Sequence, residues 1–238
     1  MIDFAKIDAM VEGYNPDGMK CGLLKPKPGW KPGDVSPLFS PDWELTDAEL
    51  DQDESDGLIP FCWHIFHQKY NSCAAESGLT VLQTTRRLLG LEDVIFNPLF
   101  VYHYVCGGRD GGAQLSDVLA TLRDKGCAPE SVWPYSNGWQ QTPSAEAVKA
   151  AEQYKLGEFY EIRSTRQFRS ALRLKWAVAC GSKGHAVSAM KDRKTYPIVA
   201  NTWARSWGEN GFGKWDGSYE ALWQTYRAFA YRTSKTVA

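Results

Sequence analysis

Hydrophobic residues after about residue 58 follow a pattern whose period changes midway along the chain. In the first half they recur at helical spacing, which predicts helices over about residues 73–89, 97–105 and 114–125. Gly90 and Gly126 stand where the first and third of these helices should end. A shorter helical pattern covers about residues 143–153.

Short apolar runs dominate the second half, and their length and turn-rich flanks predict strands. The predicted strands span residues 156–162, 176–180, 185–190, 196–202, 212–215 and 223–232. One further helix begins after Ser164, where Ser164 and Gln167 form a capping-box pattern, and runs to Leu174. Helices therefore precede strands, and we expect an α+β fold with a helical lobe and a strand-rich lobe.

The first 57 residues, which we call the leader, differ from the domain predicted for residues 58–238. Prolines interrupt the leader throughout, and a lysine-rich section is followed by an acidic one. We expect an extended segment draped over the domain. A pro-segment that blocks a cleft and an arm that docks onto this chain or onto a partner are the alternatives. Trp30, Phe39 and Trp43 would serve as apolar anchors for either.

Composition and charge exclude several classes of function. A formal net charge of −1 gives no electrostatic case for nucleic acid as the main partner. No run of about eighteen apolar residues predicts a membrane span, and residues 1–6 lack the features of a secretory signal. The six cysteines stand singly, and His64 and His67 beside Cys62 have no second ligand pair. We therefore expect no metal, no cofactor, and reduced thiols in the cytoplasm or another reducing compartment.

One cysteine, Cys73, opens a predicted helix after the candidate N-cap Ser72. The positive end of the helix dipole favours a thiolate at such a position, although buried and inert cysteines are commoner. A nucleophile also needs a base, a group that orients the base, and donors for the oxyanion. His185, which follows a glycine at the start of a strand, is a candidate base. Asn201, an amide among apolar strand residues, is a candidate partner for its ring.

The run Asn201-Thr202-Trp203-Ala204-Arg205-Ser206-Trp207-Gly208-Glu209-Asn210-Gly211-Phe212-Gly213 resembles a segment of the papain-like cysteine peptidases. Residues 184–187 resemble that family's histidine strand, and residues 72–75 resemble its nucleophile motif, less closely. Residues 110–135 resemble the stretch between the two. The resemblance covers roughly residues 60–232. It implies a papain-like fold of two lobes, one helical and one an antiparallel, barrel-like sheet, with the active site in a cleft between them.

Carried over residue by residue, the resemblance implies a Cys-His-Asn triad. Cys73 would be the nucleophile, His185 the general base and acid, and Asn201 the residue that orients His185. Gln68 would donate its side-chain amide to the oxyanion hole, together with the backbone N–H of Cys73. The implied activity is hydrolysis of peptide bonds in a polypeptide substrate through an acyl-enzyme.

The resemblance also implies four substrate-binding residues. Gly111 and Gly112 would line the non-primed side of the cleft and bond a substrate backbone. Ala186 would border the pocket for the side chain that precedes the scissile residue. Trp207 would lie near the primed side.

Several features depart from the family pattern. Gln68 lies five residues before Cys73 rather than six, and Ala74 replaces the aromatic residue that usually follows the nucleophile. The family's disulfide would need cysteines close to Tyr70 and at Arg109, and both are missing. The leader shows no recognisable helical propeptide pattern. Two alternatives therefore stay open: an amidase or transpeptidase acting on cell-wall or isopeptide bonds, and a catalytically silent binding or structural protein, such as a component of a larger particle.

Overall fold

The structure is a computed structural model that describes residues 2–10, 19–29, 31, 37, 41–52 and 56–232. Its helices are α1 (Phe4–Asp8), α2 (Asp47–Asp51), α3 (Cys73–Leu88), α4 (Pro98–Val105), α5 (Leu115–Asp124), α6 (Ala145–Ala151), α7 (Thr165–Arg173) and α8 (Tyr219–Trp223). Its strands are β1 (Phe159–Ile162), β2 (Val178–Ser182), β3 (His185–Asp192), β4 (Pro197–Ala200), β5 (Phe212–Gly213) and β6 (Ala228–Tyr231).

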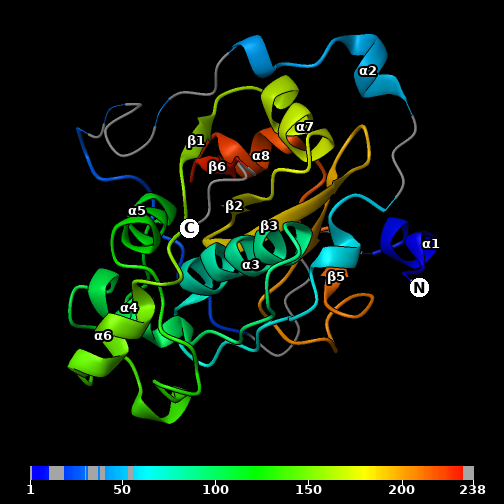
Figure 1. Ribbon diagram of the computed structural model, residues 1–238. Coiled ribbons are helices and arrows are strands. Elements are labelled where there is room, and N and C mark those ends of the chain that lie inside the picture. Colours follow the sequence, from blue (N-terminus) through cyan, green and yellow to red (C-terminus); the bar gives the residue numbers. More distant parts are fainter. Residues whose placement is uncertain are drawn as a thin grey trace.

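The strands form one antiparallel sheet in the order β1-β6-β2-β3-β4-β5. Helices α4, α5 and α6 gather on one side of the molecule, whereas α7 and α8 lie with the sheet, and α3 runs between the two groups (Figure 1). The predicted α+β fold, with helices first and an antiparallel strand-rich part second, is confirmed.

Side chains on β3 alternate between two hydrophobic cores, as the period of a strand requires. Ala186 and Met190 belong to the core beneath α3, whereas Val187 and Ala189 belong to the core under α7 and α8. Ser77 of α3 donates a hydrogen bond of 2.8 Å to the carbonyl of Val187. The helix is thereby fixed directly against the strand that begins at His185.

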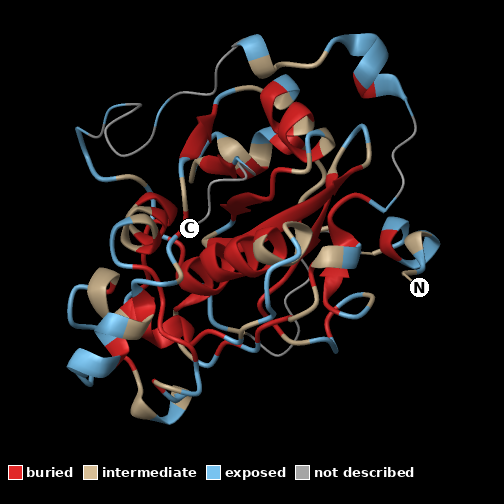
Figure 2. Cartoon of the chain, viewed as in Figure 1, coloured by how far each residue is buried: buried red, intermediate tan, exposed pale blue. Residues whose placement is uncertain are grey.

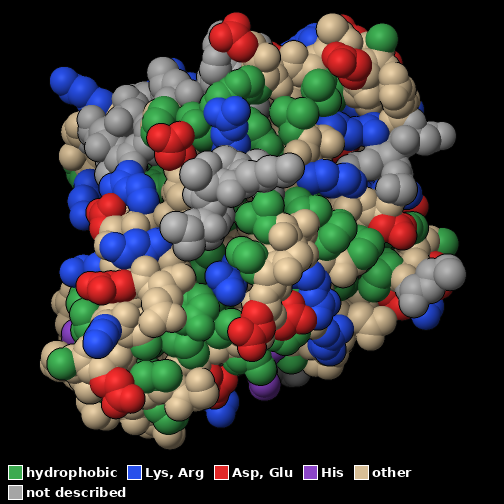
Figure 3. All heavy atoms as spheres, viewed as in Figure 1, with side chains coloured by type: hydrophobic (Ala, Val, Ile, Leu, Met, Phe, Trp, Pro, Cys, Tyr) green, Lys and Arg blue, Asp and Glu red, His purple; other side chains and the backbone are tan. Residues whose placement is uncertain are grey.

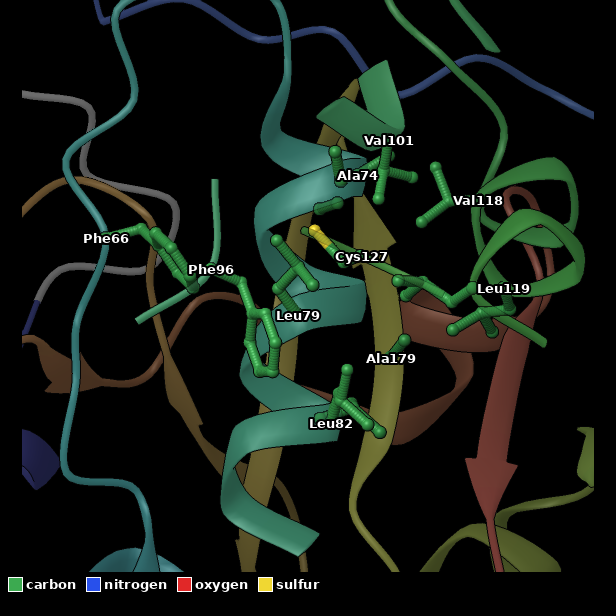
Figure 4. Packing of buried hydrophobic residues seen from close by; sticks show 14 of the residues in the cluster. Phe66, Ala74, Leu79, Leu82, Phe96, Val101, Val118, Leu119, Cys127 and Ala179 are labelled. Atoms are coloured by element: carbon green, nitrogen blue, oxygen red, sulfur yellow. The ribbon is translucent and has the colours of Figure 1, made fainter. Parts of the chain in front are cut away.

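Helix α3 is buried on every side over Cys73–Thr85, and Figure 2 shows it as a central buried rod. Small residues allow this close packing: a Cβ atom on Gly78 would lie 2.8 Å from a methyl group of Val118 on α5. Leu79 and Leu82 point into the cluster that also contains Val118 and Leu119 (Figure 4). Since the whole first turn is enclosed, the position of Cys73 is set by packing from both lobes.

Three local predictions need correction. Residues 223–232 were expected to be one strand, but α8 ends at Trp223 and β6 begins only at Ala228. Ser72 precedes α3 but does not cap it, because its hydroxyl donates to Glu76 at 3.1 Å. Ser164 does cap α7, but the Gln167 side chain accepts from Arg163 N–H instead of completing a capping box.

The leader is helical at α1 and α2 rather than extended throughout, and it is anchored to the domain. Ile7 and Leu50 are buried, and the carbonyl of Leu50 accepts hydrogen bonds from Arg169 and Arg173. Trp43 packs edge-on against Tyr160 and Trp176, with ring centroids 4.6 and 4.9 Å apart. The other two expected anchors, Trp30 and Phe39, lie outside the described residues.

No helix in the described part of the chain is long and apolar enough to cross a membrane. On the face shown in Figure 3, acidic and basic side chains are interspersed, in keeping with the nearly balanced charge of the sequence.

Candidate active site

Cys73 is the first residue of α3 and is fully buried. Its sulfur accepts a hydrogen bond from the backbone N–H of Gly22, with 3.3 Å between nitrogen and sulfur. The leader therefore reaches the predicted nucleophile.

His185 begins β3, is fully buried, and lies 2.7 Å from Asn201 through its Nε2 atom. The Oδ1 atom of Asn201 also accepts the N–H of Thr202 at 2.7 Å, which identifies it as an oxygen. Nε2 of His185 must then carry the proton, because an amide oxygen only accepts. Nδ1 of the neutral ring is left as a base, and it has no hydrogen-bond partner among the described residues.

Two tryptophans enclose the His185–Asn201 hydrogen bond. Trp203 stacks on the imidazole with ring centroids 4.2 Å apart, and Trp215 meets it at 5.0 Å and a steep angle. Trp207, predicted near the primed side, packs against Trp203. Burial by these rings strengthens the hydrogen bond, since water is kept away from it.

Gln68 is buried, and both ends of its side-chain amide are engaged. Its oxygen accepts the hydroxyl of Thr202, and its Nε2 atom donates to the backbone carbonyl of Lys20 at 2.7 Å and to that of Tyr70 at 3.1 Å. The amide hydrogens are thus directed at a peptide carbonyl beside Cys73, which is what an oxyanion donor requires. The one-residue offset of Gln68 from the family spacing does not turn its amide away from the site.

Backbone hydrogen bonds from both lobes hold the leader beside Cys73. Leu23 N–H donates to the carbonyl of Gly184 at 2.8 Å, next to His185. On the other side, Leu24 N–H donates to the carbonyl of Ala113 at 2.9 Å, and Ala113 N–H donates to the carbonyl of Gly22 at 2.8 Å. The last two bonds form a parallel bridge between Leu23 and Ala113. An extended segment is therefore held beside Cys73 by main-chain hydrogen bonds from both lobes, in addition to the side chain of Gln68.

Glycines make this close approach possible. A Cβ atom on Gly22 would lie 1.9 Å from the carbonyl oxygen of Asn71. A Cβ atom on Gly112, whose φ is +93°, would lie 2.1 Å from the carbonyl oxygen of Gly22. Only glycine fits at either position while the leader is in place.

The leader presents an N–H group to the sulfur of Cys73. The carbonyl held by Gln68 belongs to Lys20, whereas the sulfur faces the N–H of Gly22, one peptide group further along. The predicted nucleophile, Cys73, thus contacts a hydrogen-bond donor of the leader.

Burial makes both members of the predicted catalytic pair neutral in this arrangement. It raises the pKa of the Cys73 thiol to about 12, although the N–H groups of Ala186 and Gly22 lower that pKa. It also lowers the pKa of His185 to about 4, against the opposing effect of the Asn201 hydrogen bond. The thiolate expected from the helix dipole is thus disfavoured while the site is covered, because desolvation outweighs the dipole.

Asn71 and Asp110 join the two segments at which the family resemblance implied a disulfide. Asn71 N–H donates to the Asp110 carboxylate at 2.8 Å, and the Asn71 side chain donates to the Asp110 carbonyl at 2.8 Å. The carboxylate also accepts from Tyr102 at 2.9 Å and pairs with Lys20 of the leader at 3.0 Å. Hydrogen bonds between Asn71 and Asp110 therefore join the two segments close to where the disulfide was expected. The six cysteines, all within the described residues, form no disulfide.

The predicted substrate-binding residues lie around the same site. Gly111 and Gly112 line a hollow of about 340 Å³ together with Leu24 of the leader, and Ala186 is buried immediately after His185. Backbone bonds to the leader come from Ala113, which sequence reasoning missed because main-chain contacts leave no mark on residue type. Larger hollows of about 680 and 730 Å³ are lined by none of the predicted site residues.

Sequence reasoning also missed Glu76, one turn after Cys73 on α3. Its side chain is fully buried, and burial raises its pKa well above the usual value against the hydrogen bond from Ser72. Glu76 is also among the groups that raise the pKa of Cys73, because a negative charge at Glu76 would oppose a thiolate. A glutamate inside an otherwise small and apolar helical turn was the available signal.

No protein-family model matches the sequence, and no curated protein matches it. Solved structures do resemble the fold. Xylellain, a cysteine protease from Xylella fastidiosa, superposes with a TM-score of 0.70 over 90% of this chain and 97% of its own, at 18% identity. Digestive procathepsin L2 proteinase from Tenebrio molitor larval midgut superposes with a TM-score of 0.68, over 92% of this chain and 81% of the procathepsin chain, at 14% sequence identity. Procathepsin B S9 from Trypanosoma congolense superposes with a TM-score of 0.62, over 89% of this chain and 86% of the procathepsin chain, at 15% sequence identity. The chain therefore has the papain-like fold.

Proposed function

We propose that this protein is a cysteine-type endopeptidase that hydrolyses peptide bonds through Cys73, His185 and Asn201. The fold supports the general class, since the similar structures are cysteine proteases. The residues that would carry the chemistry are supported by separate contacts: His185 is oriented by Asn201, Gln68 donates to a carbonyl of the leader, and the buried Cys73 thiol contacts the same leader at Gly22.

The observation that carries the proposal is the peptide already held at the site. Gln68 donates to a peptide carbonyl, and the main chains of Ala113 and Gly184 bind the same extended segment. Main-chain hydrogen bonds accept almost any sequence, as strand-addition modes of peptide recognition do. This arrangement favours a polypeptide substrate over a glycan-linked cell-wall fragment.

The proposed mechanism begins when the leader withdraws and water reaches the site. Nδ1 of His185 accepts the thiol proton, and the Cys73 thiolate attacks the scissile carbonyl carbon. Gln68 stabilises the oxyanion, and Asn201 holds the imidazolium through Nε2–H. His185 then protonates the leaving amine, and a water molecule activated by His185 hydrolyses the acyl-enzyme.

In this proposal, residues 19–27 of the leader act as an inhibitory segment. They cover Cys73, occupy the donor of Gln68, and hold both titratable partners neutral. Productive binding would require a substrate carbonyl to take the place of the Lys20 carbonyl. Activity is therefore expected only from the state in which the leader has left.

Replacement of the nucleophile tests the assignment. Cys73→Ala should abolish both protein hydrolysis and labelling by a thiol-directed epoxide, whereas Cys106→Ala, which changes another buried cysteine, should keep both. Unchanged hydrolysis in Cys73→Ala would sink the proposal. Activity on peptidoglycan fragments with none on proteins would instead support the amidase or transpeptidase alternative. An ordinary thiol pKa for Cys73, with no activity on any amide, would support a catalytically silent binding or structural protein.

A further inference from the structure

We propose that Cys21 of the leader forms a reversible disulfide with Cys73, so that an oxidant locks the leader over the site. Its effect on activity rests on the proposed function, whereas formation of the disulfide does not. Cys21 is exposed, and Cys73 is fully buried directly behind it.

The Gly22–Cys73 hydrogen bond fixes how near the two cysteines lie. Standard bond lengths put the Cα atom of Cys21 about 2.4 Å from the nitrogen of Gly22. That nitrogen is 3.3 Å from the Cys73 sulfur, so the Cα atom of Cys21 lies at most about 5.7 Å from the sulfur. In a trans peptide this Cα atom is on the same side as the amide hydrogen, which shortens the separation further.

In a disulfide, the Cα atom of one cysteine lies at most about 4.5 Å from the sulfur of the other, as the bond lengths require. The upper limit of about 5.7 Å for Cys21 exceeds this by only about 1 Å, so a small shift of the leader brings the two sulfurs into bonding range. The thiol of Cys21 now contacts the carbonyl of Met19 at 3.7 Å, so its side chain must rotate toward Cys73. Cys21 is also among the groups that raise the pKa of Cys73, after burial and Glu76.

The leader is attached to the domain on both sides of Cys21, which keeps Cys21 close to Cys73. Lys20 is fixed on one side by Gln68 and by its 3.0 Å ion pair with Asp110. On the other side, Leu23 is buried and bonded to Gly184. Cys21 lies between these attachments, and a thiol held in this way has a high effective concentration toward its partner.

The oxidant is a hydroperoxide, and the reaction balances in two steps. In the open state the Cys73 thiolate attacks a peroxide oxygen, and the O–O bond breaks to give the sulfenic acid and hydroxide. The hydroxide takes the thiol proton that His185 had accepted and leaves as water. When the leader returns, the sulfur of Cys21 attacks the Cys73 sulfur, the S–O bond breaks, and the hydroxide departs as water with the Cys21 proton. Two thiols and one hydrogen peroxide give one disulfide and two waters, so the sulfurs lose two electrons and the peroxide gains them.

The Cys21–Cys73 disulfide would protect the Cys73 thiol from further oxidation as well as block its reactivity. Without a resolving thiol, further peroxide takes a sulfenic acid to the sulfinic acid, which thiol reductants do not reverse. With Cys21 in reach, the oxidised enzyme is stored as a disulfide. Dithiothreitol, or thiols of a reducing compartment, then restore it.

The test uses the full chain with hydrogen peroxide as the oxidant. Wild type, Cys21→Ser and the control Cys106→Ser are treated, alkylated in denaturant and digested without reduction, and peptides are analysed by mass spectrometry. We expect a Cys21–Cys73 linked peptide in wild type and Cys106→Ser only. Labelling of Cys73 by an epoxide should then recover with dithiothreitol at least about threefold more fully in these two proteins than in Cys21→Ser.

The opposite results overturn the inference. A wild type without the linked peptide, whose Cys73 is recovered no better than that of Cys21→Ser, rules the lock out. A linked peptide that forms in a protein without peptidase activity in any state would leave the disulfide standing and remove the proposed function. The two proposals can therefore fail separately.

Discussion

Gly22→Ala should open the site, because the leader cannot keep its present position with a side chain at residue 22. The added methyl group would lie 1.9 Å from the carbonyl oxygen of Asn71, a backbone atom that cannot rotate away. Real Cβ contacts are essentially never shorter than 3.0 Å, so relief of this contact requires the two backbones to separate by about 1.1 Å or more. Such a movement breaks the hydrogen bonds that Gly22 makes to Cys73 and to Ala113, and the bond from Leu23 to Gly184.

The size of the effect follows from these three bonds. Each contributes about 0.5–1.5 kcal/mol net, so their loss shifts the closed state by about 1.5–4.5 kcal/mol relative to the open state. A shift of that size changes the ratio of open to closed protein by about 10-fold to 2,000-fold. Because Cys73 is fully buried when closed, its labelling rate reports the open fraction directly.

The assay is the second-order rate of Cys73 alkylation by a small thiol-directed epoxide at neutral pH, read by mass spectrometry. Gly22→Ala should react about 10-fold or more faster than wild type. Lys25→Ala, an exposed change in the same leader, should react at the wild-type rate. A thermal melt confirms that each variant is folded. If folded Gly22→Ala reacts no faster than wild type, the leader does not control access to Cys73.

Three further changes test the site and its support. Asn201→Ala, made together with Gly22→Ala so that the leader is displaced, should lower turnover by about 10–100-fold. The reason is that a charge-assisted hydrogen bond to His185, worth about 1.5–3 kcal/mol, is lost. Turnover equal to that of Gly22→Ala alone would contradict this. His185 has a pKa of about 4 in the folded protein against 6.5 when exposed. Between these pH values the unfolded state therefore binds more protons than the folded state. The free energy of unfolding should fall by up to a few kcal/mol as the pH drops from about 6.5 to about 4. Urea unfolding should show that slope in wild type and a smaller one in His185→Gln; equal slopes would refute it. Asp192→Ala should cost about 3–5 kcal/mol in urea unfolding, since it leaves Arg169 and Arg173 without their buried carboxylate; a loss under 1 kcal/mol would show that the two arginines are satisfied otherwise.

Local patterns carried most of the fold prediction. The α3 helix starts at Cys73 and β3 at His185, as apolar spacing and the preceding glycine indicate. Both predicted helix-capping arrangements that failed did so because a side chain bonded to another group within the same turn. Ser72 gives its hydroxyl to Glu76 instead of capping α3, and only the folded helix brings the two together in a buried turn.

The path of the leader could not be read from the sequence. Its contacts with Ala113 and Gly184 are main-chain hydrogen bonds across 89 and 161 residues, and such bonds place no demand on residue type. Gly22 carries the one local signal, a glycine where no turn is needed, and it has meaning only once Asn71 is known to lie against it. The pKa of Cys73 follows from that cover, so it too was beyond sequence reasoning.

The most direct measurement compares protein hydrolysis by Gly22→Ala with that by the double variant Gly22→Ala/Cys73→Ala. Both carry the same displaced leader, so only the thiol differs. The account predicts turnover of an unfolded protein substrate by the first and none by the second. Equal turnover by both, or none by the first while its Cys73 is alkylated rapidly, would contradict it.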